Sequence, residues 1–264
     1  MLAEIIKMLP HEEFIYYADT LHSPYGSKSE DVVRSLSIKA AEFLSRLGIK
    51  SLVVACNTAT CAAIAEIRAM FSFPVIGMEP AIKPAVESKS RGKTLVMATP
   101  LTLKSRKFHE LVCKYKHLAG IMPLPCPGLV DIIEQGYIQG HVIQEYLSQI
   151  FSQINKEDIS TIVLGCTHYV LIKSEIVKVV GSNIPIIERN SGTARHLRNV
   201  LQSKALLADT TMERPQFPLK AKVRFHVSGH KKEVTTLCRR LLQGEGIVCE
   251  ESYAPTKSPY VRSD

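Results

Sequence analysis

Several features that would assign a function at once are missing from this chain of 264 residues. It has no apolar run of the ~18–20 residues that a membrane-spanning helix needs. It contains neither a Gly-x-Gly-x-x-Gly segment nor a Walker-type loop, which argues against the common nucleotide-binding classes. Glu4, Glu12 and Glu13 argue against a secretory signal at the N-terminus. We therefore expect a cytoplasmic protein whose cysteines remain free thiols, with no contact to a membrane.

The sequence also lacks the ligand spacing of a zinc site and the aromatic pattern of a nucleic-acid interface. Cys56 and Cys61 are too far apart for a Cys-x-x-Cys pair, and His168 alone does not complete a ligand set, so no metal is predicted. The net charge of +8 is concentrated after Arg195. No aromatic residues are interleaved there for base stacking, so we interpret this region as a solvated basic face rather than a nucleic-acid site.

The chain does contain a regular alternation of short apolar runs and amphipathic segments. Strands are predicted at 14–18, 51–55, 75–77, 94–98, 121–124, 161–164, 185–187, 222–227 and 247–250. Helices are predicted at 1–7, 30–47, 60–71, 81–89, 102–115, 129–135, 141–154, 171–180, 192–206 and 231–242, with Asn190 and Ser191 as a cap and 209–218 as a linker. Alternation of this kind predicts an α/β fold with mainly parallel sheets.

Two of the predicted strands end at a cysteine that is followed by polar residues. One segment reads Ala-Cys-Asn-Thr-Ala-Thr at 55–60, and the other reads Leu-Gly-Cys-Thr-His-Tyr at 164–169. Ligands of parallel sheets bind beyond the carboxyl ends of the strands, where Thr99 and Cys126 also fall. We predict that two halves of the protein present Cys56 and Cys166 to one pocket from opposite sides.

A helix that begins after a cysteine can supply both a base and an anion site. Its free N–H groups favour a thiolate and, with the hydroxyls of Thr58, Thr60 and Thr167, can hold a carboxylate. A single such cysteine is often only a small buried hydrophobic residue, but two in matching contexts favour chemistry. Two reactions remain open: nucleophilic catalysis with His168 as the base, or a two-base proton transfer, which the duplication favours.

Taken together, the motifs closely resemble the signature segments of bacterial glutamate racemases, in the aspartate/glutamate racemase superfamily. The resemblance is carried by the segments at 55–60 and 164–169, by Ser-Pro-Tyr-Gly at 23–26 and by Ala-Thr-Pro at 98–100, and it extends from the first residues to about residue 253. It implies a cofactor-independent interconversion of L- and D-glutamate that supplies D-glutamate for peptidoglycan synthesis.

The same resemblance implies a role for each matching residue. Cys56 would take the α-proton from D-glutamate and Cys166 from L-glutamate, and each would act as the acid in the other direction. His168 and Glu134 would assist Cys166. The expected substrate contacts are Tyr25, Gly26, Asn57, Thr58, Thr167 and His168.

The implied architecture is a pair of pseudo-symmetric α/β domains with the active site between them. The first domain would comprise residues 1–81 plus 189–253, the second would comprise 82–188, and 254–264 would form a flexible tail. The sequence leaves the oligomeric state open, a homodimer included.

The chain departs from the family pattern at its start, because Met1 falls inside the first helix of that pattern. The preceding strand and its Asp-Ser-Gly loop are not in the sequence, so we expect the first domain to lack a central strand, Cys56 to be the weaker base and activity to be impaired. Val170 replaces a customary proline with little effect. A racemase for aspartate or another amino acid, and a non-catalytic protein that retains ligand affinity, remain alternatives.

Overall fold

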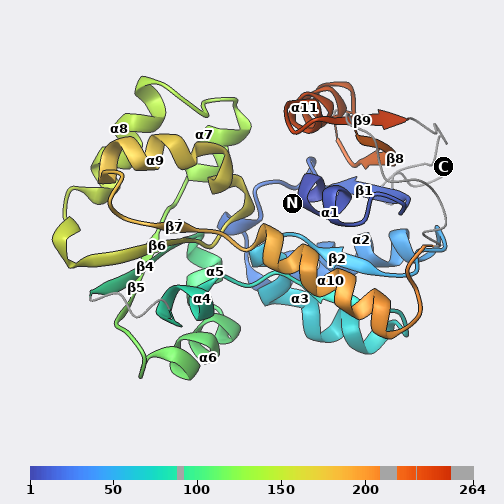
Figure 1. Ribbon diagram of the computed structural model, residues 1–264, viewed down its shortest axis with the longest axis horizontal. Helices are drawn as coiled ribbons and strands as arrows, with labels where there is room; N and C mark the ends of the chain where they lie inside the picture. Colours follow the sequence, from blue (N-terminus) through green and yellow to red (C-terminus); the bar gives the residue numbers. More distant parts are fainter. Residues whose placement is uncertain (88–91, 209–218, 230, 251–264) are drawn as a thin grey trace.

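The computed structural model describes residues 1–87, 92–208, 219–229 and 231–250, which form two lobes lying side by side (Figure 1). We call residues 1–81 and 189–250 the first lobe and residues 82–188 the second lobe. The strands are β1 (Phe14–Ala18), β2 (Leu52–Val54), β3 (Val75–Gly77), β4 (Lys93–Ala98), β5 (Ile121–Pro125), β6 (Ile159–Leu164), β7 (Ile186–Ile187), β8 (Leu219–Val227) and β9 (Ile247–Glu250). The α-helices are α1 (Leu2–Met8), α2 (Glu30–Ser45), α3 (Asn57–Met70), α4 (Ile82–Glu87), α5 (Pro100–Lys104), α6 (Arg106–Tyr115), α7 (Leu129–Glu134), α8 (His141–Phe151), α9 (Lys173–Val180), α10 (Asn190–Ser203) and α11 (Lys231–Gly244). Short 3₁₀ helices are η1 (Tyr25–Ser27), η2 (Lys156–Asp158) and η3 (Thr167–Ile172).

The second lobe is a parallel sheet in the order β5-β4-β6-β7, covered by helices on both faces. Figure 1 shows α7, α8 and α9 on one face and α4, α5 and α6 on the other. Alternate residues of β4 enter the two cores: Leu95 and Met97 join the cluster under α7–α9, whereas Val96 joins the cluster under α4 and α6. This burial on both faces explains why the central strands read as continuous apolar runs.

The first lobe contains two parallel sheets, β1-β8-β9 and β2-β3. Although β1 and β2 belong to different sheets, Tyr17 of β1 and Val54 of β2 pack against the same apolar cluster, to which α2 and α3 contribute Leu44 and Ile67. The carboxyl ends of β2 and β3 lie next to the start of α3, where the hydroxyl of Thr60 bonds to the backbone at both ends.

The helices predicted at 102–115 and 171–180 are not continuous α-helices in the structure. The segment predicted at 102–115 is two helices: Thr99 caps α5, and the hydroxyl of Ser105 accepts a hydrogen bond from the N–H of Phe108 to start α6. The segment predicted at 171–180 begins as η3 and becomes α-helical only at Lys173. The predicted cap at Asn190 is also wrong, because Asn190 already belongs to α10 and Arg189 occupies the N-cap position.

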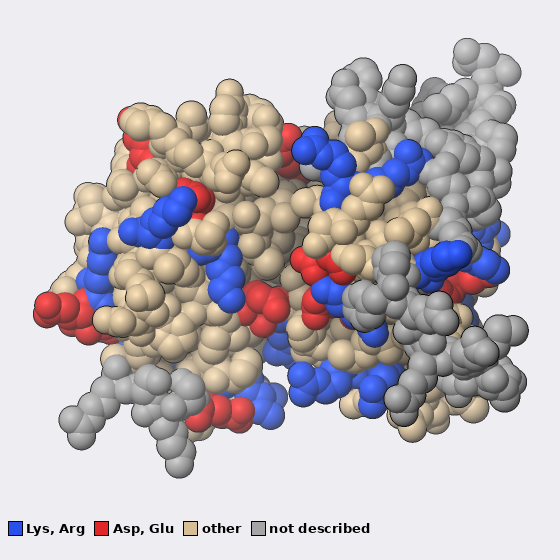
Figure 2. Space-filling view, turned by 45° about the horizontal axis from the view of Figure 1, so that its top comes forward, with Lys and Arg blue, Asp and Glu red and all other residues tan. Residues whose placement is uncertain are grey.

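The predicted linker at 209–218 and the predicted tail at 254–264 lie outside the described residues. Within the described ranges, no helix combines the length and the hydropathy that crossing a bilayer requires. On the face shown in Figure 2, Lys and Arg side chains form separate groups with Asp and Glu between them. Lys222, which belongs to the basic region after Arg195, donates to the carboxylate of Glu13 at 2.9 Å.

Candidate active site

Cys56 sits where β2 gives way to α3, at the N-cap position of the helix. Its Sγ accepts a hydrogen bond from the N–H of Ala59 at 3.5 Å. Cys56 packs against the buried cluster of Val33, Ala59 and Ala62, which Tyr25 and, from the second lobe, Leu101 also contact. The thiol therefore lies at the boundary between the lobes.

Several opposing effects act on the Cys56 thiol. Burial raises its pKa to about 11, because the thiolate would lose contact with water. Hydrogen bonds from Ala59 and Thr58 act in the opposite direction, whereas negative charge on Cys166 raises the pKa further. This last effect means that Cys56 and Cys166, 110 residues apart in sequence, interact electrostatically in the folded protein.

Cys166 follows β6 and occupies the N-cap position of η3, where it is buried. Its Sγ lies 3.8 Å from Nδ1 of His168, and the other ring nitrogen, Nε2, lies 3.1 Å from Oε1 of Glu134. The structure thus brings together Cys166 and the two residues, His168 and Glu134, that were expected to assist it.

The histidine in this group favours its charged form. Burial alone would lower the pKa of His168, but contacts with Cys166 and Glu134 outweigh burial and raise it to about 10. Burial likewise opposes the charge on Glu134, yet hydrogen bonds from His168 and Ser23 lower the pKa of its carboxyl group. An imidazolium between a thiol and a carboxylate compensates negative charge on Cys166.

Buried polar groups beside Cys56 join the two lobes. The hydroxyl of Thr58 lies 2.9 Å from that of Thr99 and 3.1 Å from that of Thr102, and these last two are 3.0 Å apart. Next to them, Oδ1 of Asn57 is buried without a hydrogen-bond partner among the described residues. A buried amide oxygen of this kind is available to a ligand that carries N–H groups.

The loop after β1 brings Tyr25 and Gly26 to the same boundary. A Cβ on Gly26 would lie 2.7 Å from Cβ of Thr99, so the close approach of the lobes requires glycine at this position. The hydroxyl of Tyr25 donates to Oδ2 of Asp19 at 2.6 Å, and the hydroxyl of Ser228 donates to Oδ1, also at 2.6 Å. Asp19 was not predicted as a site residue, although it directly follows a parallel strand and so obeys the rule that located the cysteines.

Of the three hydroxyls predicted to hold an anion, those of Thr58 and Thr60 both have protein partners: Thr58 contacts Thr99 and Thr102, and Thr60 bonds within its own lobe. The hydroxyl of Thr60 donates to the carbonyl of Val54 and accepts from the N–H of Met78, so it joins the ends of β2 and β3 instead. Thr167 lies next to Cys166 at the start of η3. Cys126, at the end of β5, is buried in the cluster that contains Cys166, and burial raises its pKa to about 12.

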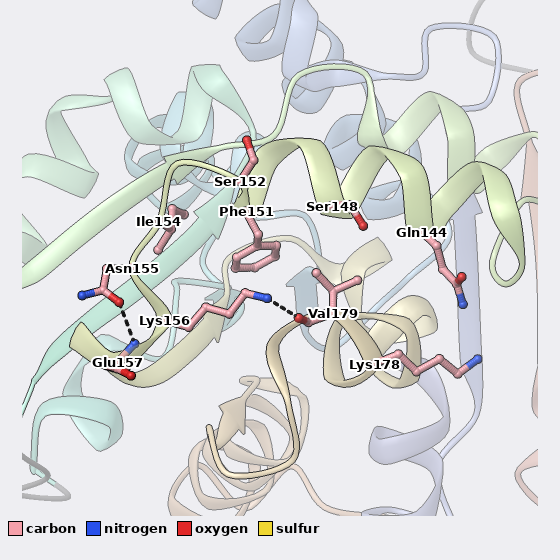
Figure 3. A pocket seen from close by; sticks show the side chains of 10 residues that line it. All are labelled: Gln144, Ser148, Phe151, Ser152, Ile154, Asn155, Lys156, Glu157, Lys178 and Val179. Atoms are coloured by element: carbon pink, nitrogen blue, oxygen red, sulfur yellow. Dashed lines mark hydrogen bonds between the residues drawn. The ribbon is translucent and has the colours of Figure 1, made fainter.

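A separate hollow of about 730 Å³ lies between α8, η2 and α9 of the second lobe (Figure 3). Its lysines have partners: Lys156 donates to the carbonyl of Val179 at 2.6 Å, and Lys178 pairs with Glu175 at 2.6 Å. None of its lining residues is a predicted site residue. Across the described part of the chain, no group of three or more His, Cys, Asp and Glu side chains is arranged to hold a metal ion.

Comparison with known proteins identifies the family. The sequence model of the Asp/Glu/Hydantoin racemase family matches residues 2–197. The glutamate racemase of Clostridium acetobutylicum is 50% identical over 208 residues, which are 78% of this chain and 81% of that protein.

Solved structures agree with this match. Glutamate racemase isoform RacE1 from Bacillus anthracis is 32% identical with a TM-score of 0.77, covering 97% of this chain and 93% of that chain. Glutamate racemase from Francisella tularensis in complex with D-glutamate is 26% identical with a TM-score of 0.78, covering 96% and 92%. The predicted α/β fold with parallel sheets is confirmed, and the chain belongs to the Asp/Glu/hydantoin racemase family.

Proposed function

We propose that this protein is a glutamate racemase, which interconverts L- and D-glutamate by proton transfer at the α-carbon without a cofactor. The observation that carries the proposal is the pair of thiols at the boundary between the lobes. Cys56 occupies the N-cap of a helix of the first lobe and Cys166 the N-cap of one of the second, and negative charge on Cys166 acts on the Cys56 thiol. Family membership and the relative at 50% identity give the substrate class.

In the direction from L to D, the thiolate of Cys166 removes the α-proton of L-glutamate and becomes a thiol. The electron pair remains on the α-carbon, and the thiol of Cys56 delivers its proton to the opposite face. Cys56 is then a thiolate, ready to remove the proton of D-glutamate in the reverse direction. The raised pKa of Cys56 supports its role as the acid in the first direction.

The Cys166 half of the site is assisted by two neighbours. His168, charged and 3.8 Å from Sγ, stabilises the thiolate before the proton is taken. Glu134 holds the imidazole through Nε2, so that Nδ1 stays directed at the thiol.

Substrate binding uses the buried polar groups around Cys56 and the loop at Tyr25. The free Oδ1 of Asn57 accepts a hydrogen bond from the substrate ammonium group. The N-terminal end of α3, at Asn57 and Thr58, attracts a substrate carboxylate through the helix dipole. The remaining contacts come from Tyr25, Gly26, Thr167 and His168.

The reaction requires reduced cysteines, and all seven cysteines are free in the structure. This supports a role in the reducing cytoplasm, where D-glutamate would supply peptidoglycan synthesis.

Circular dichroism of glutamate solutions tests the proposal, because racemisation abolishes the optical signal of either enantiomer. We expect the optical signal to decay to zero whether L- or D-glutamate is supplied, because both reactions end in the same racemic mixture. The signal of aspartate should decay much more slowly. Stabilisation of the protein by glutamate without loss of optical signal would instead support a non-catalytic binding protein. Faster loss of the aspartate signal would assign a different substrate.

A further inference from the structure

One hydrogen bond joins the two lobes beside the second thiol. Ser23, in the loop after β1 of the first lobe, donates through Oγ to Oε1 of Glu134, the last residue of α7, at 2.6 Å. The same oxygen lies 3.1 Å from Nε2 of His168, and Nδ1 of that ring faces Cys166. A chain of contacts therefore runs from the first lobe to the thiol of the second.

We propose that Ser23 is a positioning residue, which holds Glu134 against His168 when the lobes approach and so prepares Cys166 for proton transfer. This inference rests on the proposed racemase function. Ser23 reaches Cys166 through Glu134 and His168, so it acts through the carboxylate.

The Glu134 carboxylate needs a second contact to hold one position, because it lies at an exposed helix end. Glu134 ends a helix, and its side chain is 37% exposed, so it can adopt many rotamers. Hydrogen bonds to an ionised carboxylate are stronger than neutral ones, and two donors on one oxygen restrict its position more than one. The bond from Ser23 thus selects the rotamer that reaches His168.

Ser23 can exert this effect only while its loop rests on the second lobe. Three residues farther along, Gly26 packs so closely against Thr99 that an added Cβ would overlap it. The loop is therefore seated on the second lobe at two points, Thr99 and Glu134. Separation of the lobes would break both contacts and release Glu134 from Ser23.

Removing the Ser23 hydroxyl changes no charge in the site. The titratable groups that face His168 are Cys166 from its own loop and Glu134 from α7, and Tyr16 of β1 is near enough to sense the charge on Glu134. Any change at His168 in a Ser23 variant must then come from the position of Glu134.

The chain offers a matched control in the same loop. The hydroxyl of Ser27 donates at 3.5 Å to the carbonyl of Pro24 and lies outside the contact chain. We would compare Ser23→Ala with Ser27→Ala, and add Ser23→Thr, which keeps the hydroxyl. Because the two enantiomers are equally stable, Ser23→Ala should lower kcat/KM equally in both directions, by about tenfold, the size expected for a lost hydrogen bond to a charged group.

Isotope effects distinguish positioning from general damage. Slower proton transfer at Cys166 should raise the primary isotope effect on kcat/KM with L-[2-²H]glutamate and lower it with D-[2-²H]glutamate. Ser27→Ala should leave both effects at their wild-type values, and Ser23→Thr should restore them. A Ser23→Ala enzyme that is slower but keeps both isotope effects unchanged would overturn the proposal, because a structural role predicts that result.

A second measurement does not depend on catalysis. In the free protein, titration of His168 by NMR should give a pKa about half a unit lower in Ser23→Ala than in Ser27→Ala. If the wild-type protein fails to racemise glutamate, the proposed function fails, and this titration still tests the contact. An identical pKa in the two variants would refute the positioning role.

Discussion

The Nδ1 atom of His168 lies 3.8 Å from the Sγ atom of Cys166, which gives the second thiol a cationic neighbour. Cys56 instead receives hydrogen bonds from Ala59 and Thr58 at the start of α3. The two halves of the site therefore handle negative charge by different means. This asymmetry and the close contact of the lobes determine how the protein should respond to substitution.

The pair of Glu134 and His168 should appear in the pH dependence of stability. In Glu134→Gln the pKa of His168 should fall from about 10 toward its ordinary value of 6.5. Both side chains are about one-third exposed, so solvent limits the loss in the free energy of unfolding to about 1 kcal/mol or less. NMR titration of His168 and urea unfolding across a pH series would measure both quantities.

The pH window of that loss follows from the two shifts. His168 has a raised pKa, so its contribution is complete below pH 6.5 and is lost as the pH rises through about 10. Glu134 has a lowered pKa, so its contribution is present above 4.5 and is lost as the pH falls. The difference in unfolding free energy between the wild type and Glu134→Gln should therefore be largest between pH 4.5 and 6.5. A difference that grows above pH 10 would contradict the assignment.

A methyl group at residue 26 should force the lobes apart. In Gly26→Ala the new Cβ would meet Thr99 at 2.7 Å, and such overpacking costs about 1–3 kcal/mol. We expect a lower melting temperature and a higher KM for glutamate. Gly192→Ala is the control, because its Cβ would have no neighbour closer than 3.8 Å and lies in a helix. Equal behaviour of the two variants would count against a tight interface at Gly26.

The hydroxyl of Thr58 should support both folding and the acidity of Cys56. Thr58→Val keeps the shape but removes contacts to Thr99 and Thr102, which should cost about 1–3 kcal/mol of unfolding free energy. It also removes a hydrogen bond that lowers the pKa of Cys56, so that pKa should rise above its value of about 11. Denaturant unfolding and the pH dependence of Cys56 alkylation, read by mass spectrometry, test the two effects, and Thr58→Ser should preserve both.

Local sequence pattern was sufficient to locate the two thiols. An apolar strand followed at once by polar, helix-forming residues is a short-range signal, and both Cys56 and Cys166 lie at such junctions. The same signal marks Asp19, which directly follows β1. The break between α5 and α6 was also predictable in principle, since Ser105 is a favourable cap inside a helical pattern.

Contacts between the lobes could not be predicted in this way. Ser23 and Glu134 are 111 residues apart, and their hydrogen bond depends on how the two lobes meet. The role of Thr102 also depends on the meeting of the lobes. In the sequence it is an ordinary helix residue, but in the structure its hydroxyl contacts that of Thr58. The pairing of β1 with β8 likewise joins strands that are far apart in the sequence, which periodicity does not encode.

The central claim is that two cysteines act as bases on opposite faces of one substrate. It is tested most directly by glutamate racemisation in D₂O with the wild type, Cys56→Ala and Cys166→Ala, with the enantiomers separated by chiral chromatography and their deuterium content read by mass spectrometry. We predict that deuterium first appears in the newly formed enantiomer, whichever enantiomer is supplied, and that either substitution abolishes racemisation. Racemisation at the wild-type rate by either single variant would contradict the two-base account.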